Sequence, residues 1–98
     1  MPFNIILTET AMKQREELRS NPALEKRYKA VKKSVQLLAN NPRHPSLNTH
    51  EYTSLSKELG KKVFEAYAEN RTPGAYRIFW HYGDEKGTIV IISIIPHP

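Results

Sequence analysis

The sequence predicts an α+β domain in the element order β-α-α-β-β-β, with a helix hairpin packed on one face of a mostly antiparallel four-stranded sheet. Three observations lead to this prediction. A short apolar run opens the chain, two helical patterns separated by one turn follow it, and three strand-like runs close it. With 98 residues, the chain is expected to form one domain, 1–98, that is too small for a Rossmann fold with helices on both faces.

The N-terminal part of the chain predicts a strand followed by a helix. Residues 3–7 read Phe-Asn-Ile-Ile-Leu, an apolar and largely β-branched run that is typical of a strand. Thr8 or Thr10 can cap the next helix, because a threonine oxygen accepts a backbone N–H that the helix leaves unpaired. We expect this helix to run to about Arg19 and to lie on the surface, since its apolar stripe is thin.

A second helix is predicted over residues 22–39, because Asn21 is a good N-cap and Pro22 suits the first helical position. The helix has one apolar stripe at spacings of three and four, made of Leu24, Tyr28, Val31, Val35 and Leu38. The short turn between the two helices predicts an antiparallel hairpin. Residues 41–61 are polar, and we expect them to form a long loop.

Three strands separated by turns are predicted at the C-terminal end: 63–68, 75–82 and 88–95. The last run is apolar on both faces apart from Ser93, so we expect it to be a central strand that is covered on both sides. The N-terminal strand is then expected to pair alongside it.

Composition excludes several classes of function. The chain has no cysteine, which excludes a disulfide scaffold, a thiolate zinc site, an iron–sulfur centre and a cysteine nucleophile. The longest apolar run is too short to span a bilayer and no signal-peptide pattern is found, so a cytoplasmic location without membrane contact is expected. The net charge of +5 permits an anionic partner such as nucleic acid or an acidic protein.

Polar side chains in the middle of predicted strands are the first candidates for chemistry. Strand alternation places Arg77 on one face with Phe79 and His81, and places Glu65 and Tyr67 together on one face of the preceding strand. An arginine fork that projects from an open sheet face suits a phosphate group. The alternative is an ion pair between Arg77 and Glu65 across the hairpin.

Histidines and one glutamate are the remaining candidates. His97 lies just past the last strand and can act as an acid or a base near neutral pH, or belong to a solvated tail. Glu51 can serve as a carboxylate base in the long loop, or be an ordinary solvated charge. The spacing of His44, His50, Glu51 and His97 matches no metal-binding motif, so we expect no metal and no cofactor.

The order and spacing of three segments resemble the RelE/ParE superfamily of toxins from bacterial type II toxin–antitoxin systems. These segments are 41–47 after the second helix, 62–67 followed by 75–80 with its Tyr-Arg pair, and 91–97 with a histidine beyond the last strand. The likeness covers essentially the whole chain. It is closest to the RelE/YoeB-like mRNA interferase branch.

This resemblance implies a ribosome-dependent mRNA endoribonuclease that arrests translation. In that reaction the 2′-hydroxyl attacks the adjacent phosphate and leaves a 2′,3′-cyclic phosphate and a 5′-hydroxyl. Arg77 matches the family's strand arginine and would stabilise the phosphate, and His97 matches the C-terminal histidine of YoeB-like members and would be the acid. Glu51 falls near the loop glutamate that is the candidate base, and Tyr67 would stack on a base or contact the phosphate.

RelE has lysines on the first hairpin strand where this chain has Glu65 and Tyr67. The residues expected to contact RNA are therefore cations at other positions: Lys26, Arg27, Lys29, Lys32, Lys33, Lys61 and Lys62. For the cations on the second helix, the alternative is that they form an ordinary solvated helix face. The implied partners are an acidic antitoxin, the ribosome and mRNA, without direct DNA contact. The alternative functions are a ParE-like gyrase inhibitor and a non-enzymatic, weakly toxic binding module on the same fold.

Overall fold

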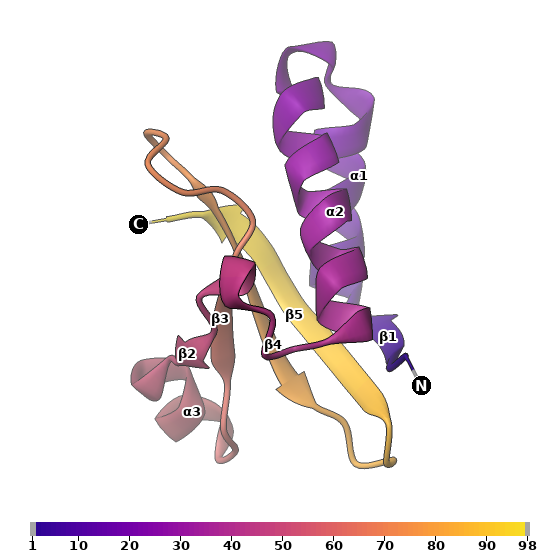
Figure 1. Cartoon of the computed structure of the whole chain (residues 1–98), viewed down its shortest axis with the longest axis vertical. Coiled ribbons are helices and arrows are strands. Elements are labelled where there is room, and N and C mark those ends of the chain that lie inside the picture. Colours follow the sequence, from indigo (N-terminus) through magenta and orange to yellow (C-terminus); the bar gives the residue numbers. More distant parts are fainter. Residues whose placement is uncertain (1, 98) are drawn as a thin grey trace.

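The computed structural model describes residues 2–97, so that Met1 and Pro98, the two ends of the predicted domain, lie outside the described residues. A helix hairpin stands over one face of a twisted sheet (Figure 1). The elements in chain order are β1 (Asn4–Leu7), α1 (Glu9–Ser20), α2 (Glu25–Asn40), β2 (His50–Glu51), α3 (Thr53–Leu59), β3 (Phe64–Tyr67), β4 (Tyr76–Tyr82) and β5 (Thr88–Pro96). Two 3₁₀ turns, Pro22–Leu24 and Pro45–Leu47, precede α2 and β2.

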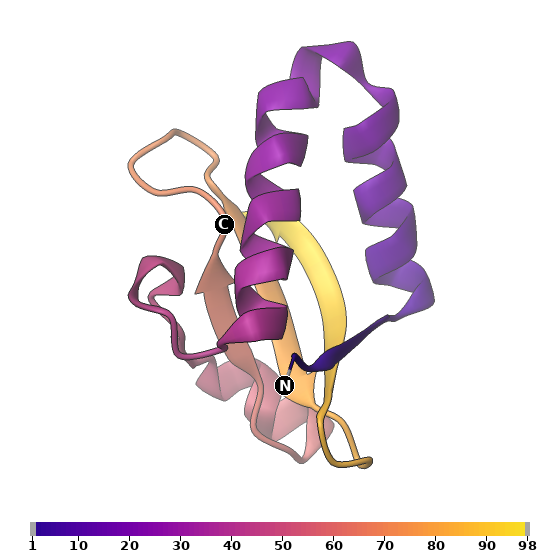
Figure 2. The ribbon, with the colours of Figure 1, turned by 45° about the vertical axis from the view of Figure 1, so that its right-hand side comes forward.

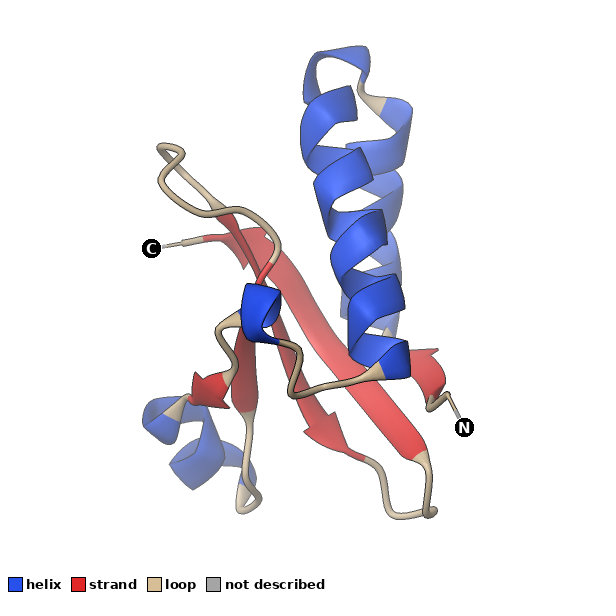
Figure 3. Cartoon of the chain, viewed as in Figure 1, coloured by secondary structure: helices blue, strands red, loops and turns tan. Residues whose placement is uncertain are grey.

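The sheet has five strands in the order β1-β5-β4-β3-β2. β5 lies between β1, which runs parallel to it, and β4, which runs antiparallel. The α+β class, the helix hairpin and the central position of the last strand are therefore confirmed (Figure 3). The strand count of four was wrong by one, because β2 adds a short fifth strand at the edge.

The segment 41–61, which was expected to be a loop, holds both β2 and α3. β2 has only two residues and pairs antiparallel with β3, so that His50 faces Glu65 across the ladder. α3 has seven residues and ends at Gly60, whose φ of 70° is the left-handed conformation that glycine adopts at low cost. Elements this short carry too few residues to show a periodic pattern.

The start of α1 is tied to the sheet through Thr8. Its hydroxyl oxygen accepts the Ala11 N–H at 3.2 Å and donates to the Ile92 carbonyl at 3.1 Å. Ile92 is the extra residue of a β-bulge, because β4 and β5 shift register between Phe79 and Trp80. The cap of α1 therefore also satisfies a carbonyl that the bulge leaves out of the ladder.

Figure 2 shows the helix hairpin lying over one face of the sheet, and the core side chains lie between the two layers. Leu18 of α1 and Val31 and Leu38 of α2 pack against sheet residues that include Ile78 and Trp80. Neither of the two long helices, nor any other helix in residues 2–97, is long and apolar enough to cross a membrane.

The second face of the sheet is only partly covered. Tyr52, which precedes α3, packs edge-on against Phe79 with ring centroids 5.0 Å apart. On β5, however, Val90, Ile92 and Ile95 remain half-buried. The expectation that β5 is covered on both sides was therefore wrong, because α3 is too short to extend over the whole second face.

Candidate active site

Five side chains from four separate segments meet on the face of the sheet opposite the helix hairpin. We call them the Glu65 cluster: Glu65 and Tyr67 of β3, Arg77 of β4, His50 of β2 and His97 after β5. Strand alternation puts Glu65, Tyr67 and Arg77 on one face, as the sequence predicts. Glu65 is the centre of the cluster and is only 3% exposed.

Arg77 is held on several sides. Its Nε lies 3.5 Å from Glu65 Oε2, and its guanidinium donates a 2.5 Å hydrogen bond to the Glu69 carbonyl. The Tyr67 ring lies under the guanidinium, with Cζ 3.6 Å from the ring centroid. The ion pair across the hairpin, one of the two alternatives for Arg77, is thus present. At 6% exposure, Arg77 has a fixed position rather than a mobile one.

His50 meets a hydrogen-bond acceptor at each ring nitrogen. Nε2 lies 2.8 Å from Glu65 Oε1, and Nδ1 lies 2.9 Å from the Asn48 carbonyl. A neutral imidazole has a single N–H, so only the doubly protonated ring donates to both acceptors. Glu65 is thus contacted by the His50 ring at one carboxylate oxygen and by the Arg77 guanidinium at the other.

His97 is attached to the cluster through its backbone. Its N–H donates a 2.7 Å bond to the Ala75 carbonyl, which continues the β4–β5 ladder past the end of β5. Its Nδ1 lies 3.8 Å from Glu65 Oε2, and the side chain is half-exposed. The ring is therefore beside the buried carboxylate and also accessible to a ligand.

Two polar atoms of the cluster are buried without a hydrogen bond from any described residue: Glu65 Oε2 and Arg77 Nε. Their separation of 3.5 Å is an ion-pair contact rather than a well-formed hydrogen bond. Unsatisfied buried polar atoms are rare in folded proteins and concentrate where a bound group completes them. No three His, Asp or Glu side chains among residues 2–97 are arranged to hold a metal ion.

Glu51, the candidate base, is not part of the cluster. It pairs with Phe64 across β2 and β3, whereas its neighbour His50 pairs with Glu65. Successive strand residues point to opposite faces, so the exposed side chain of Glu51 projects away from Arg77. Sequence reasoning named His50 only as a loop histidine, because the pairing of β2 with β3 is not encoded in local spacing.

The cations that were expected to contact RNA lie in three different environments. Lys26, Lys32 and Lys33 are exposed on α2, and Lys29 is exposed beside Glu25 at 3.3 Å. Lys61 and Lys62 are exposed just before β3, at the end of that strand away from Tyr67.

Arg27 differs from the other cations of α2 because its guanidinium is bound to residues elsewhere in the fold. It pairs with Glu69 at 3.1 Å and donates to the carbonyls of Pro73 and Gly74 at 2.9 and 2.7 Å. These contacts fasten the 70–74 turn to α2. The guanidinium is thus a clamp for the loop that follows β3 rather than a free cation.

No family model and no curated protein sequence matches the chain. Solved structures do match over its full length. The YoeB/ParE toxin from Agrobacterium tumefaciens has a TM-score of 0.72 and 8% identity, covering 97% of this chain and 99% of the toxin. The YoeB dimer from Staphylococcus aureus has a TM-score of 0.72 and 14% identity, covering 100% of both chains.

A third neighbour is the toxin–antitoxin complex RelBE2 from Mycobacterium tuberculosis. It has a TM-score of 0.64 and 22% identity, covering 99% of this chain and 100% of the neighbour. These matches span the helix hairpin and the whole sheet, so the sequence-based resemblance and the three-dimensional comparison agree on one architecture. The chain therefore has the RelE/YoeB-like toxin fold.

Proposed function

We propose that this chain is the toxin of a toxin–antitoxin pair and cleaves mRNA on the ribosome. The observation that carries the proposal is the meeting of Arg77 and His97 at one buried carboxylate, on a sheet face that is only partly covered. A phosphate-binding fork beside an accessible imidazole is what cleavage of a phosphodiester by its own 2′-hydroxyl requires. The fold is that of solved YoeB and RelE toxins.

In the proposed reaction, the 2′-oxygen forms a bond to phosphorus and the bond from phosphorus to the 5′-oxygen breaks. Arg77 stabilises the charge that develops on the phosphate oxygens. His97 gives a proton to the departing 5′-oxygen. The proton of the 2′-hydroxyl passes to solvent water, because Glu65 is committed to His50 and Arg77, and Glu51 projects from the other face of β2.

The other cluster members act through Arg77. Tyr67 fixes the plane of the guanidinium by stacking against it. Glu65 is shared between Arg77 and His50, because each of these side chains contacts one of its carboxylate oxygens. His50 is therefore a positioning residue in this proposal, and its loss should weaken phosphate binding more than the proton-transfer step, because Glu65 would lose its second contact beside Arg77.

The exposed lysines of α2 supply contacts to RNA backbone in this proposal: Lys26, Lys29, Lys32 and Lys33. Such contacts weaken as salt concentration rises, because they depend on release of counterions. The expected partner protein is an acidic antitoxin in the cytoplasm that covers the Glu65 cluster. The Mycobacterium tuberculosis neighbour is itself a toxin–antitoxin complex, which supports this part of the proposal.

The test is induced expression of the chain without a partner, followed by mapping of mRNA 5′ ends. The wild type should stop growth and translation and generate new 5′-hydroxyl ends within coding regions. His97→Ala should lower the cleavage roughly 10²–10⁴-fold, which is the usual contribution of a general acid. His81→Ala is the matched control, because His81 lies on the same strand as Arg77 but its ring is hydrogen-bonded, among residues 2–97, only to the Tyr82 carbonyl.

One further variant tests the role of the carboxylate outside the cluster. Glu51→Gln should leave cleavage unchanged, and a loss as large as that of His97→Ala would make Glu51 the base instead. Intact mRNA during growth arrest by the wild type would contradict the nuclease proposal.

One observation favours the alternative without RNA cleavage: Arg77 is 6% exposed and already paired. A ParE-like inhibitor would remain toxic as His97→Ala and would block supercoiling by gyrase. An inert binding module would not arrest growth at all. The same expression experiment therefore distinguishes all three functions.

A further inference from the structure

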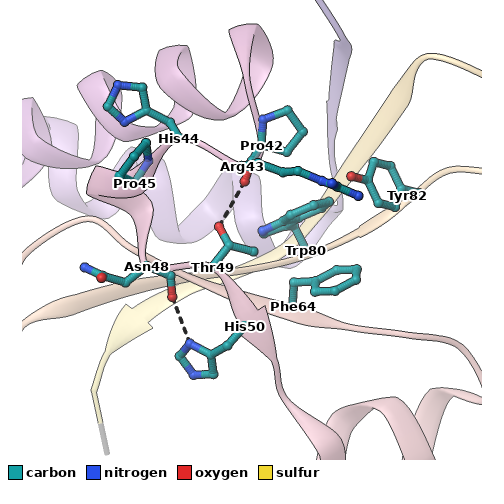
Figure 4. Close-up of a pocket in the computed structure, with 10 residues that line it drawn as sticks. All are labelled: Pro42, Arg43, His44, Pro45, Asn48, Thr49, His50, Phe64, Trp80 and Tyr82. Atoms are coloured by element: carbon teal, nitrogen blue, oxygen red, sulfur yellow. Dashed lines mark hydrogen bonds between the residues drawn. The ribbon is translucent and has the colours of Figure 1, made fainter.

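A second candidate binding site lies on the helix side of the sheet, away from the Glu65 cluster. It is a pocket of about 400 Å³ between the crossing segment 42–50 and the ends of β3 and β4 (Figure 4). This volume lies within the range of about 300–1,000 Å³ that is usual for small-ligand sites. His50, on the edge strand, borders both this pocket and the cluster.

One wall of the pocket consists of aromatic rings. Phe64, Trp80 and Tyr82 form a contiguous group with ring centroids 4.9, 5.1 and 6.0 Å apart. Phe64 and Trp80 are largely covered, whereas Tyr82 is 45% exposed and is one of the few large exposed apolar side chains. A flat and partly exposed ring of this kind is the surface on which a nucleic acid base stacks.

A free guanidinium lies beside this aromatic wall. Arg43 follows α2, and its side chain extends toward Tyr82 in Figure 4. Unlike Arg27 and Arg77, it makes no ion pair with any carboxylate of residues 2–97. Arginine beside an exposed aromatic ring matches the two chemical parts of a nucleotide, its phosphate and its base.

The indole of Trp80 gives a third and independent indication. Trp80 is 1% exposed, and its Nε1 has no hydrogen-bond acceptor among the described residues. In Figure 4 this nitrogen lies on the Thr49 side of the pocket, while the Thr49 hydroxyl donates to the Pro42 carbonyl instead. An indole N–H is a donor only, so a ligand carbonyl or ring nitrogen is the group that would satisfy it.

We propose that this pocket binds one nucleoside 5′-monophosphate unit, free or within single-stranded RNA. The base stacks on Tyr82 and offers an acceptor to Trp80, and the phosphate is bound by Arg43. Because the pocket and the Glu65 cluster lie on opposite faces, the proposal stands apart from the cleavage reaction. An RNA strand bound at both sites would pass around the β2 edge at His50.

The test uses Trp80 as its reporter, because it is the only tryptophan of the chain. The purified chain is titrated at low salt with AMP, CMP, GMP and UMP, and with a short single-stranded RNA, and tryptophan fluorescence and binding heat are measured. A saturable signal is expected from at least one monophosphate, with weaker binding of the corresponding nucleoside and of inorganic phosphate. Tighter binding of the RNA would identify the strand as the source of the nucleotide.

Arg43→Ala should weaken this binding roughly tenfold to a hundredfold, as expected for the loss of a charge-assisted bond. Arg15→Ala on α1 is the matched control. It removes the same charge from an exposed arginine that also forms no ion pair with a carboxylate of residues 2–97, and it should leave the affinity unchanged. Tyr82→Phe should retain binding and Tyr82→Ala should weaken it.

The proposal is overturned if calorimetry and fluorescence detect no binding of any monophosphate or of the RNA. It is also overturned if Arg43→Ala and Arg15→Ala bind equally well. His97→Ala should retain full nucleotide binding at this pocket. The binding experiment and the cleavage experiment therefore test the two proposals separately, and either proposal can fail without the other.

Discussion

Replacement of Arg77 by methionine should destabilise the fold strongly, apart from any effect on function. The substitution keeps much of the side-chain length but removes the positive charge that faces Glu65 at 3.5 Å. It also removes the hydrogen bond to the Glu69 carbonyl and the contact with the Tyr67 ring. Glu65, which is only 3% exposed, then retains, among residues 2–97, the rings of His50 and His97 as its close partners and no permanently charged one.

The size of the effect follows from the burial of both groups. Removal of one partner from a buried ion pair costs about 3–5 kcal/mol, because the remaining charge stays desolvated. Small domains are stable by about 5–15 kcal/mol in total, so Arg77→Met should lose a large part of the stability. A loss of 3 kcal/mol or more corresponds to a fall in Tm of roughly 12 °C or more for a domain of this length.

Urea unfolding followed by the fluorescence of Trp80 measures the change, and Lys33→Met on the exposed face of α2 is the control. The double variant Glu65→Gln/Arg77→Met should recover most of the loss, because the amide carries no charge that needs a partner. The reasoning is refuted if Arg77→Met unfolds within about 1 kcal/mol of the wild type, or if Glu65→Gln lowers stability further in the double variant.

Three smaller effects on stability are expected, each measured by the same unfolding assay. Arg27→Ala should lower the free energy of unfolding by about 1.5–3 kcal/mol, because it removes an ion pair and two hydrogen bonds to carbonyls. Lys29→Ala is the control and should lower it by about 0.5 kcal/mol or less. Equal losses would contradict the role of Arg27 in fastening the 70–74 turn to α2. Thr8→Ala should cost about 1–2 kcal/mol, because it removes both the helix cap and the bond to the bulge, and Thr8→Ser should retain most of the stability. Gly60→Ala should lower the free energy of unfolding by about 1 kcal/mol, because alanine is strained at a positive φ. No steric clash adds to this cost, since no neighbouring atom lies within 4 Å of an added Cβ. Gly60→Asn should cost less, because asparagine tolerates the left-handed conformation better.

The sequence predicts the long elements well because their signals are local. The apolar stripe of α2, the proline turn that precedes it and the turns between the last strands each depend on residues that are close in the chain. The central position of β5 also follows from its composition, since only a strand with two neighbours and a covered face carries so many β-branched residues. β2 and α3 were missed because they are short and depend on contacts with β3 and Phe79.

The candidate site could be predicted only in part, for the same reason. Alternation along single strands places Arg77, Glu65 and Tyr67 on one face, and this needs no knowledge of pairing. The inclusion of His50 instead of Glu51 depends on a one-residue register between β2 and β3, which nothing local determines. The commitment of Arg27 to the 70–74 turn is equally a product of the three-dimensional fold.

The order of strands in the sheet has a consequence for synthesis of the protein. β5 is translated after every other strand, although it occupies the centre of the sheet. Until it emerges, β1 lacks its only strand partner, and β4 has a neighbour on one side alone. His97 follows β5 and joins the Glu65 cluster only once that strand is seated. A nascent chain therefore cannot complete the cluster while residues 88–97 are still inside the ribosome, so a partial product of translation lacks the assembled Glu65 cluster.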